Sequence, residues 1–492
     1  MSWTDFTLVA PVAAAVAVAA LVILVDMVRP GASRPALGVA FLGLAGVVAL
    51  TWWVGQEPGE AFGGSYTVDD LATFIDLLFA GIVVVTLLVA PEYLGPRGLP
   101  VAEFAAILAF ALAGAMLVAG AADLVVLFLG LELMVIPGYL LAGFHRRDAL
   151  STEGAVKYFL LGSFSSAIFL FGLAFTWGLT GTTRIDGVAA ALAEVVAGRT
   201  TLPAGLAMGL ALLTTGVAFK IAAVPFHYWT PDAYQGSPTP VTGYLSVGPK
   251  VGAFALILRL FAEALGPLAG DWLIVVYVLA ALTMTLGNLV ALTQDNVKRM
   301  LAYSSIAHTG YMLVGLAAYA AGQQAGLEGL LFYGAAYAVM NLGAFAVIAA
   351  LQRRPGVTSR LETFAGLGRR EPLLGALMVL FLLSLTGIPP TAGFFAKAYV
   401  ILAAVQEGGW LAVLAVIAVL NAAAAAFYYL RVVVYMYMRE PAGEPAPVAH
   451  GALIRLGLAV TAVGTILLGL LPGPLLTVVG EAARVLATAV VH

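Results

Sequence analysis

Apolar stretches of about 20 residues recur along the whole chain, separated by short polar connections. An α-helix rises 1.5 Å per residue, so about 20 residues cross the roughly 30 Å hydrocarbon core of a bilayer. Hydrophobic residues make up 62% of the 492 positions and charged residues only 10%, whereas charged residues reach about a quarter of a soluble domain. The ten-residue alternation of transmembrane strands is absent. The sequence therefore predicts an all-α polytopic membrane protein with about fourteen transmembrane helices. The expected helix centres fall near Val18, Val47, Ile82, Leu108, Leu133, Phe164, Leu212, Phe254, Tyr277, Gly310, Ala338, Leu383, Val419 and Ala462.

Basic residues are distributed unevenly among the connections. Most of those outside the apolar segments fall in odd-numbered connections, counted from the N-terminus; Arg29, Arg146 and Lys298 are examples. Even-numbered connections carry acids such as Glu57 and Asp69. By the positive-inside rule the odd-numbered connections are cytoplasmic. We therefore expect a multi-pass protein with both termini on the non-cytoplasmic side.

The residue types that usually hold metals and redox centres are scarce. Cysteine is absent, which excludes thiolate-held iron–sulfur clusters, zinc–thiolate sites and disulfides. The five histidines are scattered and form no close ligand pair. We expect this chain to bind no cofactor and no metal, and any electron transfer to occur in another subunit. No basic arm indicates a nucleic-acid partner, so the bilayer is the expected surrounding.

Two short matches indicate an internal repeat. The run GYLLAG at Gly138 resembles GYMLVG at Gly310, and a Gly-x-x-x-Lys pattern ending at Lys220 recurs, in the same order, ending at Lys397. The matches suggest a duplicated unit of about five helices, and an odd number of spans inverts the second copy, as in many transporters. We divide the chain into an N-terminal three-helix region (1–100), a first five-helix repeat (101–265), a second, inverted five-helix repeat (266–440) and a C-terminal helix and tail (441–492).

Prolines stand beside charges inside the apolar segments. A proline removes one helical hydrogen bond and clashes with the preceding turn, leaving carbonyls that water or a cation can use. Broken helices are therefore expected near these charges. The four pairs are Pro225 with Lys220, Gly387-Ile388-Pro389-Pro390 with Lys397, Pro137 with Glu132, and Pro249 with Lys250.

Glu132, Lys220, Lys250 and Lys397 each lie deep within an apolar run. A charge at bilayer depth costs a few kcal/mol or more unless it is paired or hydrated, so such groups are functional by default. Burial favours the neutral form of a lysine, and a nearby carboxylate favours the charged form. We interpret Glu132 and Lys220 as a switch pair, Lys250 as the next proton carrier and Lys397 as the carrier in the second repeat. The bland alternative is that these charges only neutralise acids of neighbouring subunits.

Three further residues are secondary candidates with open alternatives. Lys157, near the start of its helix, could carry protons or could extend to the cytoplasmic surface. His308, in SSIAHTGY, could bridge Lys250 to Lys397 or could be a satisfied interior group. His227, in PFHYW near the cytoplasmic end, suits a proton inlet or a helix cap equally well.

Three long motifs resemble a known family. The runs FKIAAVPFHYWTPDAYQGSPTPV, GPKVGAF and DNVKRMLAYSSIAHTGYMLVGL resemble the antiporter-like membrane subunits of respiratory complex I, the proton-pumping NADH:quinone oxidoreductase. The turn from Trp229 to Gly236 is most similar to the N-type subunits, and the resemblance extends from about Ala122 to about Arg431.

The resemblance implies fourteen helices with two inverted five-helix repeats. It also implies a glutamate on the fifth helix and lysines on the seventh, eighth and twelfth, which match Glu132, Lys220, Lys250 and Lys397. The expected role is that of a non-redox, proton-translocating subunit in a bacterial inner membrane. FMN, iron–sulfur clusters and quinone would be held by other subunits of the complex. Partners would be an M-type antiporter-like subunit and small K-, J- and A-type subunits.

Two other functions remain open at this stage. One is an Mrp-type cation/proton antiporter, which an ion gradient would drive. The other is a passive scaffold whose charges pair between subunits. Co-purification with flavin and iron–sulfur subunits would distinguish a subunit of the NADH:quinone oxidoreductase from an Mrp-type antiporter.

Overall fold

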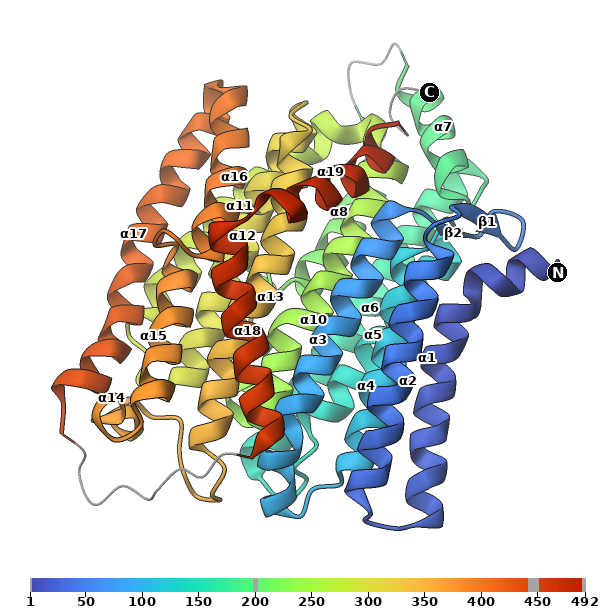
Figure 1. Cartoon of the computed structure of the whole chain (residues 1–492). Coiled ribbons are helices and arrows are strands. Elements are labelled where there is room, and N and C mark those ends of the chain that lie inside the picture. Colours follow the sequence, from blue (N-terminus) through green and yellow to red (C-terminus); the bar gives the residue numbers. More distant parts are fainter. Residues whose placement is uncertain (1, 198–201, 441–450, 489–492) are drawn as a thin grey trace.

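The computed structural model describes residues 2–197, 202–440 and 451–488. Long helices run side by side through a slab, with short connections on its two faces (Figure 1). Eleven helices in the described part are long and apolar enough to cross a membrane. All fourteen expected centres lie within helices; the three outside this set of eleven lie in two short apolar helices, α8 and α15, and in the more polar α12. An all-α polytopic fold is thereby confirmed, while the count of fourteen spans stays a prediction.

The elements follow the chain in the expected order. The N-terminal region contains α1 (Trp3–Val28), α2 (Ser33–Val54), β1 (Gly59–Ala61), β2 (Tyr66–Val68), α3 (Asp70–Leu94) and η1 (Gly95–Arg97). Next come α4 (Val101–Ala119), α5 (Leu124–Ala142), α6 (Ala149–Thr180), α7 (Ile185–Val196), α8 (Ala204–Lys220), α9 (Trp229–Gly236), α10 (Thr239–Ile257), the π-helical η2 (Leu258–Ala264) and η3 (Gly266–Leu268). They are followed by α11 (Ala269–Ala291), α12 (Val297–Ala320), α13 (Ala325–Leu351), η4 (Leu361–Phe364), α14 (Leu367–Arg370), α15 (Pro372–Thr386), α16 (Ala392–Glu407), α17 (Gly409–Met438), α18 (Ala452–Leu470) and α19 (Gly473–Thr488).

Acidic and amide side chains set the starts of several spans. Asp123 accepts a hydrogen bond from the Val125 amide at the start of α5, and Asp148 does the same for Leu150 at the start of α6. Asn296 caps α12 in the same way. Such caps satisfy amides that would otherwise lack a partner at a helix end. Short connections with built-in caps fix where each span enters the membrane.

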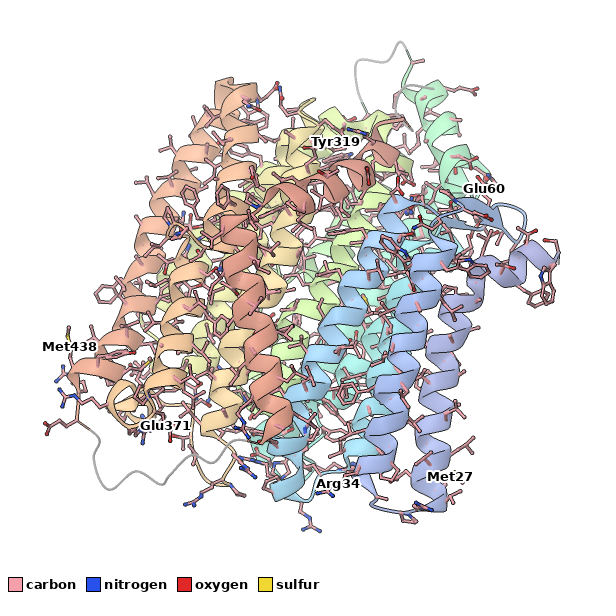
Figure 2. All side chains as sticks on the ribbon, in the orientation of Figure 1. Met27, Arg34, Glu60, Tyr319, Glu371 and Met438 are labelled. Atoms are coloured by element: carbon pink, nitrogen blue, oxygen red, sulfur yellow. The ribbon has the colours of Figure 1, made fainter. Side chains whose placement is uncertain are left out.

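The two faces of the slab differ in charge as predicted. Figure 2 shows Arg34 at the lower face and Glu60 at the upper face. The start of α1 and helix α19 both lie toward the upper face (Figure 1). Lys298 is an exception among the basic residues that we counted as surface markers. It is 3% exposed, and its Nζ donates to the Ser237 carbonyl at 2.5 Å. Its ammonium group therefore forms a hydrogen bond inside the protein, at the start of α12, and does not mark the surface.

The centre of the slab is formed by α10 and α13. Every residue of α10 is buried, and α13 is nearly as enclosed. The outer helices α1, α2, α6, α11, α17 and α18 expose many of their apolar residues, as lipid-facing helices do. Polar side chains on α10 and on the neighbouring faces of α12 and α13 are consequently shielded from lipid.

Two predicted helix breaks are confirmed. α8 ends at Lys220 and α9 begins only at Trp229, while α15 ends at Thr386 and α16 begins at Ala392. Ala222 (φ 57°) and Gly387 (φ 93°) have left-handed backbone conformations at these points, which stop a right-handed helix.

The breaks that we expected at Pro137 and Pro249 were wrong. α5 continues through Pro137 and α10 through Pro249. One proline deletes a single amide donor, and a helix flanked by packed neighbours tolerates that loss when no left-handed residue follows. The proline alone is therefore a weaker signal than a proline next to a left-handed residue.

The upper face carries elements that the hydropathy pattern did not predict. β1 and β2 form a small antiparallel hairpin in which Glu60 pairs with Thr67. Below it, the buried Arg259 of η2 donates to Asp69 and Glu263, each at 2.7 Å, and to the Ala119 carbonyl at 2.8 Å. This arginine joins the ends of α3, α4 and α10. Helix α19 lies across the upper ends of α3 and α13 (Figure 1).

Close packing of α4 on α5 gives a stability prediction. A Cβ added at Gly114 would lie 2.3 Å from the Met134 backbone nitrogen, whereas a Cβ at Gly81 on α3 would meet nothing within 4 Å. We expect Gly114→Ala to destabilise the protein by about 1–3 kcal/mol, because backbone atoms cannot move aside as side chains do. Gly81→Ala, the matched control, should leave the thermal midpoint in detergent within about a degree or raise it. Equal midpoints for the two variants would contradict this packing.

Candidate functional site

Glu132 and Lys220 lie together, joined by a serine. The Ser166 hydroxyl on α6 donates to Glu132 Oε1 at 2.6 Å and accepts a hydrogen bond from Lys220 Nζ at 2.8 Å. The direct distance from Lys220 Nζ to Glu132 Oε1 is 3.9 Å. Lys220 also approaches the Tyr139 hydroxyl at 3.4 Å. The predicted pair is thus a connected unit, and the serine supplies a continuous path of two hydrogen bonds between the charges.

The position of Lys220 at the last residue of α8 suits a positive charge. The C-terminal end of a helix carries partial negative charge and carbonyls without helical partners. The side chain of Lys220 is 5% exposed and that of Glu132 is 25% exposed. The amine is therefore enclosed, while the carboxylate keeps some access to the surroundings.

Helix α12 connects the α8 break to Lys250. The Thr309 hydroxyl donates to the carbonyl of Ile221, directly after Lys220, at 2.8 Å, and also to the Ser305 carbonyl at 3.3 Å. Lys250 Nζ donates to the same Ser305 carbonyl at 2.5 Å and to the Ser305 hydroxyl at 2.7 Å. Lys250 is 3% exposed, and no acid of the described residues lies within ion-pair distance of it. Its amine is held by a serine alone.

His308 lies one turn further along α12, among tyrosines. Its Nδ1 is 2.6 Å from the Tyr333 hydroxyl and its Nε2 is 3.2 Å from the Tyr429 hydroxyl. Its ring also lies 4.9 Å from that of Tyr337, over which Lys250 Nζ sits at 5.4 Å. Both ring nitrogens therefore have hydroxyl partners, and neither contacts a lysine directly.

Lys397 binds the end of the other broken helix. Its Nζ donates to the carbonyls of Leu385 and Thr386, the last two residues of α15, at 2.9 and 2.8 Å. It also lies 4.8 Å above the Tyr311 ring, a distance suited to a cation–π contact. A Cβ at Gly387 would come within 3.0 Å of the Lys397 side chain, so a residue without Cβ leaves the space that the lysine fills.

The two repeats place one tyrosine beside each lysine. Tyr139 of the first glycine–tyrosine match touches Lys220, and Tyr311 of the second touches Lys397. The same shift of 172 positions takes Glu132 to Ser304, so the second repeat has no acid at that place. The two lysines of the Gly-x-x-x-Lys match occupy different places in the fold. Lys220 lies before the break that follows α8, whereas Lys397 lies after the break between α15 and α16.

Helix α12 contacts Lys250, Lys397 and the turn that follows Lys220. Ser305, His308, Thr309 and Tyr311 lie within a seven-residue stretch of α12, with about 9 Å of rise, and they contact Lys250, the tyrosine cluster, the α8 break and Lys397 in turn. That all the charged groups lie near one depth stays a prediction. Direct hydrogen bonds do not join one lysine to the next among the described residues. The buried hydroxyls of Tyr311 and Tyr337 have no protein partner in the described chain, so each can bind water.

Lys157 and His227 belong to a different place, near the lower face. Lys157 pairs with Glu153 at 2.6 Å and with Asp232 at 2.7 Å, and Arg299 pairs with the other oxygen of Asp232 at 2.7 Å. Lys157, Asp232, Arg299 and His227 line a cavity of about 590 Å³ between α6, α9, α11 and α12. The His227 side chain is buried and its Nδ1 has no partner in the described part of the chain. That arrangement fits a polar inlet better than a helix cap.

Sequence reasoning missed the residues that hold the amines. Ser166 stands in GSFSSAIF and Ser305 in YSSIAH, and both are small polar residues within apolar helices. A serine hydroxyl can hydrogen-bond to a backbone carbonyl of its own helix, so a serine within a membrane helix does not by itself indicate a functional role. In the described ranges no group of three or more histidine, cysteine, aspartate or glutamate residues is placed to hold a metal ion.

Comparisons with known proteins identify the family of the chain. The family model described as NADH:quinone oxidoreductase/Mrp antiporter, TM, matches residues 121–421. NADH-quinone oxidoreductase subunit N of Trichlorobacter lovleyi is 43% identical over 470 residues, with 94% of each chain covered. The protein of the same name in Chloroflexus aggregans is 43% identical over 486 residues, with 98% of each covered.

Solved structures show the same fold. A chain of respiratory complex I from Thermus thermophilus with bound aureothin is 32% identical, with a TM-score of 0.78 over 95% of this chain and 98% of that one. A chain of the Mrp complex from Dietzia sp. has a TM-score of 0.83 over the full length of both, at 24% identity, which shows the fold alone. The chain therefore belongs to the NADH:quinone oxidoreductase/Mrp antiporter family, in its NADH-quinone oxidoreductase subunit N branch.

Proposed function

We propose that this chain translocates protons as a membrane subunit of an NADH:quinone oxidoreductase, through Glu132, Lys220, Lys250 and Lys397. The observation that carries the proposal is the Glu132–Ser166–Lys220 unit, which α12 links to the other two lysines. The chain itself performs no redox step: FMN, iron–sulfur clusters and quinone belong to other subunits. Redox chemistry there changes the charge or position of groups that act on this relay.

The switch is a proton transfer between a lysine and a carboxylate. Lys220 can pass a proton to the Ser166 oxygen as the serine passes its own to Glu132, which leaves a neutral amine and a neutral acid. Two unit charges 3.9 Å apart attract by on the order of 4 kcal/mol at an effective dielectric constant of about 20. That energy exceeds the roughly 2.3 kcal/mol that 100 mV supplies per charge. Moving or neutralising Glu132 removes this attraction, so Lys220 holds its proton less tightly by an energy comparable with that of the membrane potential.

The onward path combines side chains and water. The Thr309 hydroxyl donates to the carbonyls of Ile221 and Ser305, which cannot relay a proton, so the step from Lys220 to Lys250 runs through water beside this contact. Water at the Tyr337 and Tyr311 hydroxyls extends the path past His308 to Lys397. His308 bridges the two lysines through its tyrosines. Lys397 receives the proton at the end of α15.

Protons enter from the lower face through the cavity beside His227. Asp232, held between Lys157 and Arg299, forms the mouth of the cavity, and His227 lies at its inner wall. Lys157 acts here by orienting Asp232 and does not carry protons within the membrane. The lower face is cytoplasmic in this proposal, and both termini lie on the other side of a bacterial inner membrane.

Subunit N relatives favour a redox-driven complex over the Mrp-type antiporter. Their 43% identity over nearly the whole chain supports assembly with an M-type antiporter-like subunit and with small K-, J- and A-type subunits. Purification in mild detergent distinguishes the two functions. Flavin- and iron–sulfur-containing partners are expected, whereas Mrp-type partners alone would reject the proposal.

Glu132→Gln tests the switch. The amide keeps the volume and removes the charge, so we expect an assembled complex whose coupled proton pumping falls on the order of tenfold, measured by a pH-sensitive dye in vesicles. Ser166→Ala should give a smaller, severalfold fall, because both charges remain and water can replace the hydroxyl that bridges them.

The adjacent Ser165 provides the matched control. Its hydroxyl donates to the Gly216 carbonyl at 3.2 Å, outside the Glu132–Lys220 unit. Ser165→Ala should pump at the wild-type rate. Unchanged pumping and quinone reduction in Glu132→Gln would reject the switch role.

Lys397 should matter independently of Lys220. We expect Lys397→Ala to impair turnover severely and Lys397→Arg to assemble yet pump poorly, because arginine stays protonated. Blue-native gels report assembly and vesicle assays report pumping. Full pumping by Lys397→Arg would mean that a fixed charge suffices at the end of α15.

The inlet is tested at His227. Replacing it with phenylalanine removes the polar wall of the cavity, so pumping should fall severalfold, while His227→Gln should retain more activity because an amide still binds water. Tyr228→Phe, which changes an exposed neighbour in the same cavity, should have no effect. If the phenylalanine variant of His227 pumps normally, the inlet lies elsewhere.

A further inference from the structure

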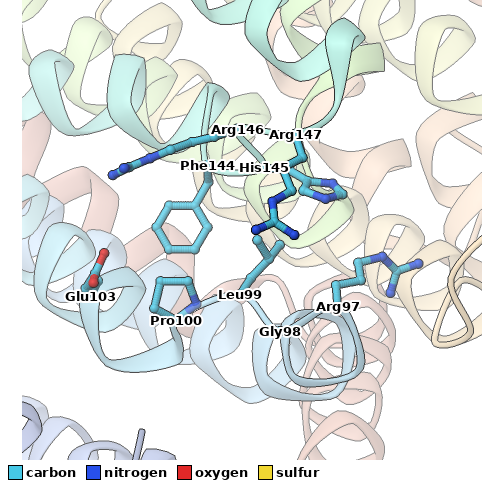
Figure 3. Close-up of a pocket in the computed structure, with 9 residues that line it drawn as sticks. All are labelled: Arg97, Gly98, Leu99, Pro100, Glu103, Phe144, His145, Arg146 and Arg147. Carbon is cyan, nitrogen blue, oxygen red and sulfur yellow. The ribbon is translucent and has the colours of Figure 1, made fainter. Parts of the chain in front are cut away.

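We propose that a basic pocket on the lower face binds the phosphate of an anionic glycerophospholipid. The basic pocket is a cavity of about 430 Å³ between the η1–α4 segment and the connection from α5 to α6 (Figure 3). Its charged lining residues are Arg97, Arg146, Arg147 and Glu103, with His145 beside them. No step of the proposed proton path uses this cavity.

The pocket has more positive charge than its own residues neutralise. Three arginines face one carboxylate, so the net charge is positive even with His145 neutral. The side chains of Arg146 and Arg147 form no hydrogen bond or ion pair with any residue in the described ranges. Figure 3 shows the Arg147 guanidinium directed over Leu99 into the pocket. A guanidinium with free paired N–H groups matches the oxygens of a phosphate.

Arg97 contributes charge in a different way. Its guanidinium donates to the carbonyls of Gln352, Arg353 and Arg354 near the end of α13, and it stacks on Tyr93. Its donors are therefore used within the protein, while its positive charge remains next to the pocket. Arg97 fixes the wall, and Arg147 is the guanidinium available to a ligand over Leu99, while Arg146, which points past Phe144 toward the Glu103 side, adds positive charge at the rim (Figure 3).

The start of α4 adds to the positive potential. Its first residue follows Pro100, and no side chain caps it. The amides of the first turn consequently lack side-chain acceptors at the point where the helix has partial positive charge. Glu103 lies in the same turn, across the pocket from Arg147 in Figure 3, and leaves the Arg147 side open to an anion.

The depth and the neighbouring surface favour a lipid over a free anion. Four candidate spans, α3, α4, α5 and α6, end or begin at the pocket, which is the level of lipid headgroups. Ile136 and Leu140 form a short exposed apolar stripe on the last turns of α5, on the pocket side of Glu132, and that helix ends just before Phe144 of the pocket. An acyl chain on the stripe and a phosphate at Arg147 would belong to one molecule. Basic pockets between spans are suited to such headgroups.

The test uses the assembled complex in vesicles with a photoactivatable phosphatidylglycerol whose acyl chain carries the reactive group. Cross-linked peptides are mapped by mass spectrometry. We expect labelling of the α5 stripe and the α5–α6 connection, and a roughly thirtyfold weaker apparent affinity in Arg146→Gln/Arg147→Gln, since each basic residue near a membrane surface contributes about fivefold. The matched control, Arg29→Gln/Arg34→Gln, removes two arginines from the same face outside the pocket and should label as wild type.

Three results would overturn the proposal. Equal labelling by a photoactivatable phosphatidylcholine would mean that the arginines do not select an anionic headgroup. Complete displacement of the lipid by excess inorganic phosphate would identify a site for the free anion. An unlabelled pocket, together with loss of a neighbouring subunit from the double variant, would identify an acidic protein segment as the occupant. Because proton pumping is not the readout, failure here leaves the proposed function untouched.

Discussion

A lysine amine inside a bilayer must find partners that replace water, and the arrangement of this protein follows from that requirement. Lys220 ends a half-helix and shares a serine with a carboxylate, Lys397 takes two carbonyls from the end of another half-helix, and Lys250 takes a carbonyl and a hydroxyl from α12. Helix ends in the middle of the slab are costly unless something uses their free carbonyls. At the α15 break the free carbonyls and the Lys397 amine satisfy each other. At the α8 break Trp229 and Thr309 donate to the free carbonyls, and Lys220 donates to Ser166.

The two repeats differ at the position that carries an acidic residue in the first one. A tyrosine touches the lysine of the broken helix in both, but Ser304 stands where the first half has Glu132. The first half carries its own counter-charge. The second half binds its lysine through dipoles alone, so the two amines respond differently to any charge that approaches from a neighbouring subunit.

Hydropathy predicted the spans, and the cost of a buried charge singled out Glu132 and the three lysines, because both signals are large and local. The breaks at Pro225 and Pro389 were predictable for the same reason, yet Pro137 and Pro249 carried the same signal without a break, since the backbone beyond them stays right-handed. Ser166 and Thr309 could not be predicted, because their roles depend on which helix packs alongside them. The contacts of Arg259 with Asp69 and with the Ala119 carbonyl likewise join segments far apart in the sequence.

One helix contacts Lys250, Lys397 and the turn that follows Lys220. Ser305 holds Lys250, Thr309 holds the turn after Lys220, and Tyr311 lies under Lys397. Ser305 and Thr309 lie one turn apart on the same face of α12, whereas Tyr311 leaves the helix on another side, so a small rotation of α12 about its axis would move Tyr311 in a different direction from the other two. A rotation of α12 would therefore change the surroundings of Lys250, of the α8 break and of Lys397 together, although these groups do not touch one another.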